Sequence, residues 1–302
     1  MRRFFRVLVA LMVLLSAPAR AEDGGRLIEY ERVEAAGLPP QRLTIWLPPG
    51  YETSGKRYPV LYMHDGHNLF ELKNSNFNKI WAADKAMLKV AAEQGIEPRI
   101  IVGVWAPGKD RFRQYLPRPA YDAAPPALKA KMDEMADGPV ISDAYLAWLA
   151  GPLKTWVDAS FRTRPGRADT AIAGSSMGGL MSCYAIAARP DVYGQGACIS
   201  SHWPAIGPDT VKGFNPETLA VWTGFFDRTL GAPAGRRIWM DHGTGTLDAF
   251  YAPYQEPIDA EFAKLGWQRG SDFESRVYPG AEHEENAWAA RLPEIFAWLL
   301  RR

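Results

Sequence analysis

Apolar residues along this chain fall into two kinds of segment. Short runs rich in β-branched and aromatic residues predict eight β-strands, over residues 27–33, 41–47, 59–63, 99–105, 170–173, 196–200, 237–241 and 273–278. Stretches with a helical repeat of apolar residues predict helices over 81–92, 144–157, 178–188, 257–265 and 287–300. Strands that alternate with helices in this way predict an α/β fold, with a mostly parallel eight-stranded sheet and helices on both faces.

Some segments depart from this regular alternation. Residues 27–33 and 41–47 alternate apolar and polar side chains across a short connection, which predicts an antiparallel hairpin at the edge of the sheet. Within the helical stretch 144–157, Gly151-Pro152 predicts a kink or two shorter pieces. Residues 106–141 carry six prolines and little periodicity, so we expect an insertion near the cleft and not a separate domain.

The first residues have the pattern of a targeting sequence. Arg2, Arg3 and Arg6 precede the nine apolar residues 7–15, and Ala19-Arg20-Ala21 follows. This pattern is typical of a secretory signal peptide, and the apolar run falls short of the roughly 20 residues that span a membrane. We therefore expect removal of residues 1–21 and a single domain over 22–302. The mature protein should be periplasmic or secreted, without membrane anchoring.

Composition and charge restrict the partners. Hydrophobic residues make up 47% of the chain and include 11 Trp, which is enough for a large core and an aromatic-lined cleft. Loss of the four arginines of the leader lowers the basic residues from 35 to 31 against 34 acidic residues, and the net charge to about −3. A surface without excess positive charge argues against nucleic acid as a partner. The sequence leaves the oligomeric state open.

The two cysteines, Cys183 and Cys198, allow two interpretations. An exported protein permits a disulfide, but a bridge from a helix to a strand requires Cα atoms within about 7 Å. We favour two buried thiols and leave the disulfide as the alternative. Their spacing is not that of a CxxC metal site.

A nucleophile motif is the strongest chemical signal. Gly174-Ser175-Ser176-Met177-Gly178 has the form G-x-S-x-G and lies between a predicted strand and a predicted helix. In this context the serine stands on a tight strand-to-helix turn, and the residues two before and two after it must be small. Only Ser176 has this spacing, so we predict that it is the nucleophile.

A serine nucleophile requires a histidine base and a carboxylate that orients the base. On an α/β sheet of this kind, the chain order is serine, acid, histidine, with the histidine after the last strand. Of the five histidines, only His283 follows segment 273–278. For the acid we predict Asp248, because the Gly243–Gly245 turn displaces it from the end of the strand toward His283; Asp241 is the alternative.

Backbone groups are expected to form the oxyanion hole. We predict the N–H of Met177 as one donor and the N–H of His67, after Gly66, as the other. All five histidines follow predicted strands and should gather at one sheet edge. A metal site made of His64, Asp65, His67 and His202 or His242 is a rival interpretation, but it leaves the serine motif unexplained. We therefore expect no metal and no cofactor.

Four ordered motifs together resemble one known family. They are residues 61–70, LYMHDGHNLF, followed by 174–179, 241–248 and 280–288. The chain resembles the α/β-hydrolase family that includes esterase D, feruloyl and acetyl-xylan esterases and enterochelin esterases, although that family often has Gln where His67 stands. The resemblance implies ester hydrolysis without a cofactor, and places the triad serine on Ser176, the histidine on His283 and the acid after the Gly-Thr turn.

Aromatic and arginine side chains in the predicted rim loops suggest how a substrate is held. We predict contacts from Trp105, Arg113, Trp203 and Trp288, with Arg111, Tyr115, Phe250 and Tyr251 nearby; packing of the insertion is the alternative role. The predicted function is a serine esterase acting on sugar-linked, feruloyl, acetyl or siderophore-type esters. An acyltransferase with the same triad and a non-catalytic binding module are the alternatives.

Overall fold

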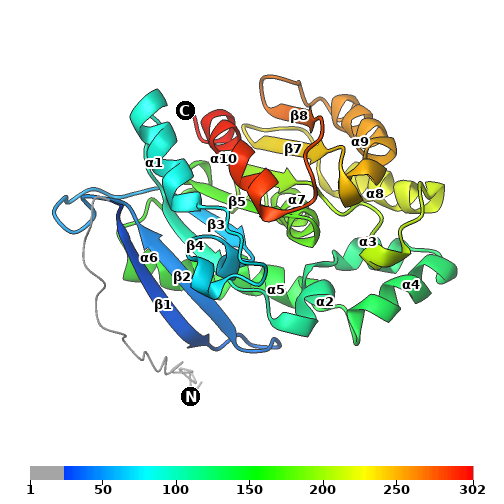
Figure 1. Ribbon diagram of the computed structural model, residues 1–302, viewed down its shortest axis with the longest axis horizontal. Helices are drawn as coiled ribbons and strands as arrows, with labels where there is room; N and C mark the ends of the chain where they lie inside the picture. Colours follow the sequence, from blue (N-terminus) through cyan, green and yellow to red (C-terminus); the bar gives the residue numbers. More distant parts are fainter. Residues whose placement is uncertain (1–23, 302) are drawn as a thin grey trace, which may run out of the picture.

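One eight-stranded sheet organises residues 24–301, which are the residues that the computed structural model describes (Figure 1). The predicted leader, 1–21, lies outside them. In the order in which they lie side by side, the strands are β1 (Arg26–Val33), β2 (Gln41–Leu47), β4 (Ile100–Val104), β3 (Val60–His64), β5 (Thr170–Ser175), β6 (Gln195–Ile199), β7 (Arg237–Gly243) and β8 (Phe273–Tyr278).

Strand directions match the prediction. β1 pairs with β2 antiparallel, and β2 with β4 antiparallel, whereas the neighbours from β4 to β8 all pair in parallel. The edge hairpin and the mostly parallel sheet are therefore confirmed. The carboxyl ends of β3, β5, β6, β7 and β8 lie along one edge of the sheet, which is where ligands bind in such folds.

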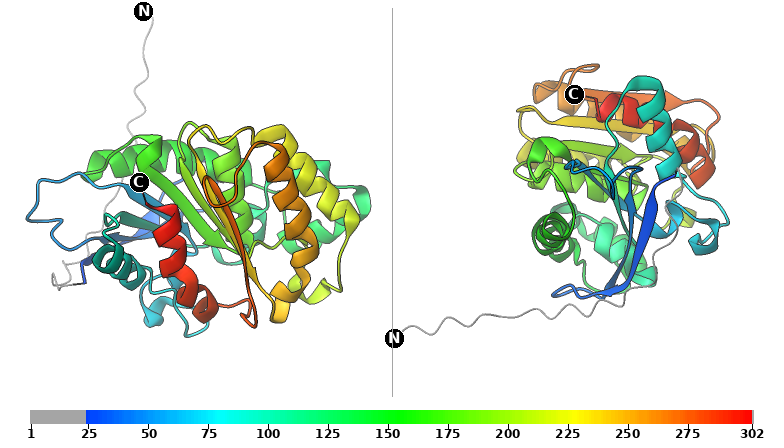
Figure 2. Two further views of the ribbon diagram at one scale, coloured as in Figure 1. Left: turned by 90° about the horizontal axis from the view of Figure 1, so that it is seen from above. Right: turned by 90° about the vertical axis from the view of Figure 1, so that its left-hand side faces the viewer.

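Helices cover both faces of the sheet. On one face lie α1 (Ala83–Gln94) and α10 (Glu285–Leu299), side by side (Figure 2). Leu61 and Met63 of β3 are buried beneath them. The other face buries Val60 and Tyr62 beneath a second group of helices. These are α5 (Ser142–Trp148), α6 (Lys154–Ser160), α7 (Met177–Ala188), α8 (Pro216–Thr229) and α9 (Ala252–Lys264). In the described part of the chain, no helix combines the length and apolarity that crossing a bilayer demands.

The insertion contains helices that the sequence did not reveal. Residues 106–141 form α2 (Arg111–Tyr115), α3 (Arg118–Ala123) and α4 (Pro126–Ala136). Helices α2 and α3 are too short to show a repeating pattern. Helix α8 was not predicted from the sequence either. Its start has a capping signal, because Asn215 accepts hydrogen bonds from the N–H groups of Glu217 and Thr218. The predicted interruption at Gly151-Pro152 is confirmed as a π-helical turn, Leu149–Leu153, between α5 and α6.

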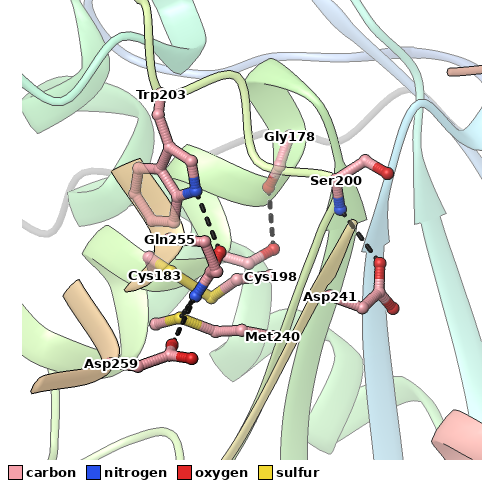
Figure 3. The surroundings of a disulfide bond; sticks show 10 residues. Gly178, Cys183, Cys198, Ser200, Trp203, Met240, Asp241, Gln255 and Asp259 are labelled. Carbon is pink, nitrogen blue, oxygen red and sulfur yellow. Dashed lines mark hydrogen bonds between the residues drawn. A yellow bond between two sulfur atoms is a disulfide. The ribbon is translucent and has the colours of Figure 1, made fainter. Parts of the chain in front are cut away.

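Cys183 and Cys198 form a disulfide, which corrects our preference for two free thiols (Figure 3). Cys183 lies on α7 and Cys198 on β6, and α7 packs directly against β6. This packing brings the two Cα atoms to 5.7 Å, within the range that a bridge requires. The bridge ties the helix that follows Ser176 to the strand that precedes Ser200.

Candidate active site

Ser176 lies on a strained turn between β5 and α7. Its backbone has φ 57° and ψ −123°, a conformation that residues other than glycine rarely adopt. A Cβ on Gly174 would lie 2.7 Å from the carbonyl oxygen of Gly178, and one on Gly178 would lie 3.1 Å from His64 Cβ. Small residues are therefore needed on both sides of Ser176, as the motif predicts.

His283 and Asp248 are in direct contact. His283 Nδ1 lies 2.6 Å from Asp248 Oδ1, and the His283 N–H donates to Thr246 Oγ1 at 2.8 Å. The loops after β7 and β8 that carry them pack tightly: a Cβ on Gly243 would lie 2.1 Å from the carbonyl oxygen of Ala281. Glycine at 243 thus permits the approach that places Asp248 beside His283.

The second oxygen of Asp248 is also occupied. Asp248 Oδ2 accepts hydrogen bonds from Ser200 Oγ and from the Gly243 N–H, both at 2.6 Å. Burial alone would raise the pKa of Asp248, but the hydrogen bonds from His283, Ser200 and Gly243 outweigh it and lower that pKa. The carboxylate is therefore held ionised and fixed in direction.

Asp241, the alternative acid, is engaged elsewhere. Arg291 Nη2 donates to Asp241 Oδ1 at 2.7 Å, and Trp239 Nε1 donates to Asp241 Oδ2 at 2.7 Å. Both Asp241 and Arg291 are buried. Asp241 therefore anchors the ends of the strands, and Asp248 is the carboxylate that contacts His283.

A cavity of about 810 Å³ opens beside Ser176 and His283. Its walls also include Met177 and His67, whose backbone N–H groups were predicted as oxyanion donors. His67 belongs to a short 3-10 helix after β3, Gly66–Asn68, which packs against β4. Glycine is required at 66 because a Cβ there would lie 2.6 Å from the carbonyl carbon of Gly103. Glycine at 66 thus allows the close packing of this turn on β4.

Several of the residues that line this cavity are charged. Arg111 of α2 donates to both oxygens of Asp65, at 2.7 and 2.8 Å, and so ties the insertion to the loop after β3. Burial would raise the pKa of Asp65, but Arg111 lowers it. Lys79 and Glu284, which also line the cavity, form an ion pair at 2.8 Å. Burial raises the pKa of Glu285, which accepts a hydrogen bond from Asn68 Nδ2 at 3.2 Å.

Of the four predicted substrate contacts, only Trp288 lines the cavity. Trp203 is fully buried and donates from Nε1 to Gln255 Oε1 at 3.0 Å. Trp105 donates to Thr44 and lies under the guanidinium of Arg42. Arg113 pairs with Asp110 of its own segment. These three side chains pack loops together, which is the alternative that the sequence left open.

Other residues line the cavity in their place. Phe77 is 67% exposed and lies in the segment between β3 and α1, while Phe112 and Met135 come from the insertion. One sequence signal could have identified Phe77: it is an apolar side chain in a polar loop soon after His67, where there is no core for it to join.

The histidines of the rival metal interpretation have other partners. His64 Nδ1 contacts Tyr145 Oη at 3.0 Å, His202 contacts Tyr251 Oη at 2.8 Å, and His242 Nδ1 contacts the Gly243 carbonyl at 2.6 Å. Burial lowers the pKa values of His64 and His202 to about 4. Across residues 24–301, no three His, Cys, Asp or Glu side chains are grouped as metal ligands.

A mostly parallel eight-stranded sheet with a strained serine between a strand and a helix defines an α/β-hydrolase. Residues 40–299 match the family model described as "Putative esterase", and the chain therefore belongs to this esterase family. It is a carboxylic ester hydrolase.

Individual relatives are distant. The chain is similar to the uncharacterised protein YbbA of Bacillus subtilis, with 24% identity over 199 residues that cover 65% of this chain and 70% of that protein. An IroE-like serine hydrolase from Shewanella oneidensis aligns with TM-score 0.64 and 16% identity, over 90% of this chain and 80% of that one. A ferulic acid esterase from Anaeromyces mucronatus aligns with TM-score 0.59 and 20% identity, over 95% and 97%. At these identities, the two structures show a shared fold.

Proposed function

We propose that the chain is an exported serine esterase that cleaves carboxylic esters through a Ser176–His283–Asp248 triad and an acyl-enzyme. The observation that carries the proposal is the 2.6 Å contact between His283 Nδ1 and Asp248 Oδ1, beside a cavity that Ser176 also lines. The strained turn at Ser176 between β5 and α7 and the membership in the esterase family support it.

Acylation follows from the direction of the imidazole. Because Asp248 accepts the Nδ1–H, His283 Nε2 carries the lone pair that takes the Ser176 proton as Oγ attacks the ester carbonyl carbon. The N–H groups of Met177 and His67 stabilise the negative charge on the carbonyl oxygen. When the tetrahedral intermediate collapses, the bond to the alcohol oxygen breaks, His283 protonates the leaving alcohol, and the acyl group stays on Ser176.

Deacylation repeats these steps with water. His283 Nε2 takes a proton from water, the hydroxide oxygen attacks the acyl carbon, and the second tetrahedral intermediate forms in the same oxyanion hole. Its collapse breaks the bond to Ser176 Oγ, which regains the proton from His283, and releases the carboxylic acid. No group beyond the triad and the backbone donors is required.

The cavity favours esters that carry a ring. Its volume, about 810 Å³, exceeds the needs of an acetyl group, and its lining includes the aromatic residues Phe112, Trp288 and Phe77, the last of which is largely exposed and free to stack on a ring. Feruloyl, sugar-linked and siderophore-type esters all meet this description. The fold shared with a ferulic acid esterase supports the first of these.

Export rests on the sequence of the leader. Arg2, Arg3 and Arg6 before the apolar run 7–15 are typical of a signal peptide. The Cys183–Cys198 disulfide supports an oxidising compartment, since such bridges are rare in the cytosol. Cell fractionation of the full chain and of a chain lacking residues 2–21 tests this part: only the full chain should reach the periplasm or the medium.

A substrate panel tests the enzymatic part. Residues 22–302 should hydrolyse feruloyl and other aryl-bearing esters with a higher kcat/KM than acetyl esters, and a fluorophosphonate should label Ser176. A protein that hydrolyses none of the panel and resists the label would contradict the proposal. Product analysis with an added sugar acceptor distinguishes hydrolysis from acyl transfer.

A further inference from the structure

Ser200 lies directly behind the catalytic acid. It follows β6 and has φ 40°, so the chain turns sharply at this point. Its N–H points at Asp241, with the carbonyl oxygen at 2.9 Å and Oδ1 at 3.2 Å (Figure 3). Its side chain points to the other aspartate, with Oγ 2.6 Å from Asp248 Oδ2. Ser200 thus connects Asp241 of β7 with Asp248 of the 3-10 turn that follows β7.

The partners of Ser200 Oγ settle the direction of its hydrogen bond. Arg291 Nη2 lies 2.6 Å from Oγ, and Trp288 Nε1 lies 3.1 Å from it. Arginine and tryptophan side chains can only donate, and a hydroxyl has two acceptor lone pairs and one proton. Both lone pairs are therefore occupied, and the single proton goes to Asp248 Oδ2.

The donors to Ser200 are themselves fixed. Arg291 Nη2 also donates to Asp241 Oδ1 at 2.7 Å, and its side chain is only 3% exposed, so the cation cannot turn away. Trp288 packs its ring edge-on to His283, with centroids 5.1 Å apart. A buried cation that donates to a hydroxyl polarises its O–H bond and strengthens the hydrogen bond that the hydroxyl gives.

We propose that Ser200 is a positioning residue for the triad acid. Its hydroxyl, held by Arg291 and Trp288, donates to Asp248 Oδ2 and thereby aims Oδ1 at His283 Nδ1. Ser200 does not touch the substrate and acts only through Asp248. The inference rests on the proposed function, since it requires Asp248 to orient His283.

A double-mutant cycle tests this role. Residues 22–302 are made as Ser200→Ala, Asp248→Ala and the double variant, and the rate of Ser176 phosphonylation and kcat for an activated ester are measured. Ser200→Ala should lower kcat about 10- to 100-fold, the usual range for a lost hydrogen bond to a charged group, with little change in KM. In the Asp248→Ala background, the same change should cost less than about twofold, because the residue through which it acts is gone.

The neighbouring serine provides a matched control. Ser201 is equally buried, and its Oγ has no hydrogen-bond partner within residues 24–301. Ser201→Ala should therefore keep kcat within about twofold, and the melting temperatures of Ser200→Ala and Ser201→Ala are measured to show that both variants fold. The inference is wrong if Ser200→Ala lowers kcat by the same factor in the wild-type and Asp248→Ala backgrounds. It is also wrong if Ser200→Ala leaves kcat unchanged while Asp248→Ala is inactive. An active Asp248→Ala would instead contradict the proposed triad.

Discussion

His283 Nδ1 lies 2.6 Å from Asp248 Oδ1 although 35 residues separate the two in the chain. The contact depends on two loops that interlock: the N–H groups of Thr244 and Gly245 both donate to the carbonyl oxygen of Ala281. Because backbone hydrogen bonds hold these loops together, Asp248 and His283 are aligned before any ester binds. Such preorganisation lowers the cost of reaching the transition state.

Replacing the nucleophile should remove turnover and leave the fold intact. Alanine has the same Cβ as serine, so Ser176→Ala adds no strain at φ 57°. We expect kcat/KM to fall by several orders of magnitude, fluorophosphonate labelling to disappear and the melting temperature to stay within a few degrees. A pure sample that keeps more than about a tenth of the wild-type activity would contradict the assignment.

Two aspartate variants should separate the catalytic acid from the structural one. Asp248→Asn should lower kcat by up to about 10⁴-fold, because an amide favours the wrong imidazole tautomer. Asp241→Asn should chiefly lower the melting temperature, since it leaves the buried Arg291 cation without its counter-ion. Measuring kcat and the melting temperature of both variants distinguishes the two roles. An active, less stable Asp248→Asn beside an inactive, normally folded Asp241→Asn would make Asp241 the acid.

Much of the fold and of the candidate site could be predicted from the local pattern of the sequence. Strands β3 to β7 are buried almost throughout, so their sequences are largely apolar and easy to recognise. The chain order of an α/β-hydrolase then selects His283 by elimination. We chose Asp248 because the Gly243–Gly245 turn was expected to displace it from the end of the strand toward His283. Both glycines lie close to the carbonyl group of Ala281, and this packing explains the displacement.

Features that depend on packing between distant segments could not be predicted. Trp105 and Trp203 follow strands in the sequence, but whether their rings face the cavity or a neighbouring loop is decided by Arg42 and Gln255, which lie far away in the chain. The Cys183–Cys198 bridge depends on how α7 lies on β6. Helices α2 and α3 are too short for a periodic signal and are stabilised by tertiary contacts.

Removing the disulfide should weaken the fold and spare the chemistry. The bridge closes a loop with a sequence separation of 15, and a cross-link of that size stabilises by about 3 kcal/mol in the chain-entropy model. Urea unfolding of Cys183→Ala/Cys198→Ala should show a loss of this order, with kcat at 25 °C within about threefold of wild type, because neither sulfur lines the cavity. Unchanged stability would show that the bridge does not form in solution.

Two buried histidines should make the fold sensitive to mild acid. Burial lowers the pKa values of His64 and His202 to about 4, whereas an unfolded histidine titrates near 6.5. Between these values the unfolded chain binds protons that the folded chain does not, so the free energy of unfolding should fall by a few kcal/mol as pH drops from about 6.5 to 4. Asp65 and Asp248, whose pKa values are lowered, contribute at lower pH: the stabilisation that they provide is lost only as the pH falls below about 4. Urea unfolding at several pH values checks the window, and His202→Gln should reduce the slope; an unchanged slope in that variant would argue against its contribution.

Phe77 should bind the ring of the substrate. It is 67% exposed yet lines the cavity, so its side chain offers stacking surface that a bound ring would cover. Aromatic pairs contribute about 0.5–1.5 kcal/mol beyond burial, and Phe77→Ala should therefore raise KM for a feruloyl ester about three- to tenfold while leaving kcat nearly unchanged. With an acetyl ester, which has no ring in the acyl group, KM should change by less than about twofold.

Leu72→Ala is the matched control, because Leu72 is 52% exposed in the same segment but lies outside the cavity lining. Equal effects of Phe77→Ala on both esters would place the ring elsewhere in the cavity.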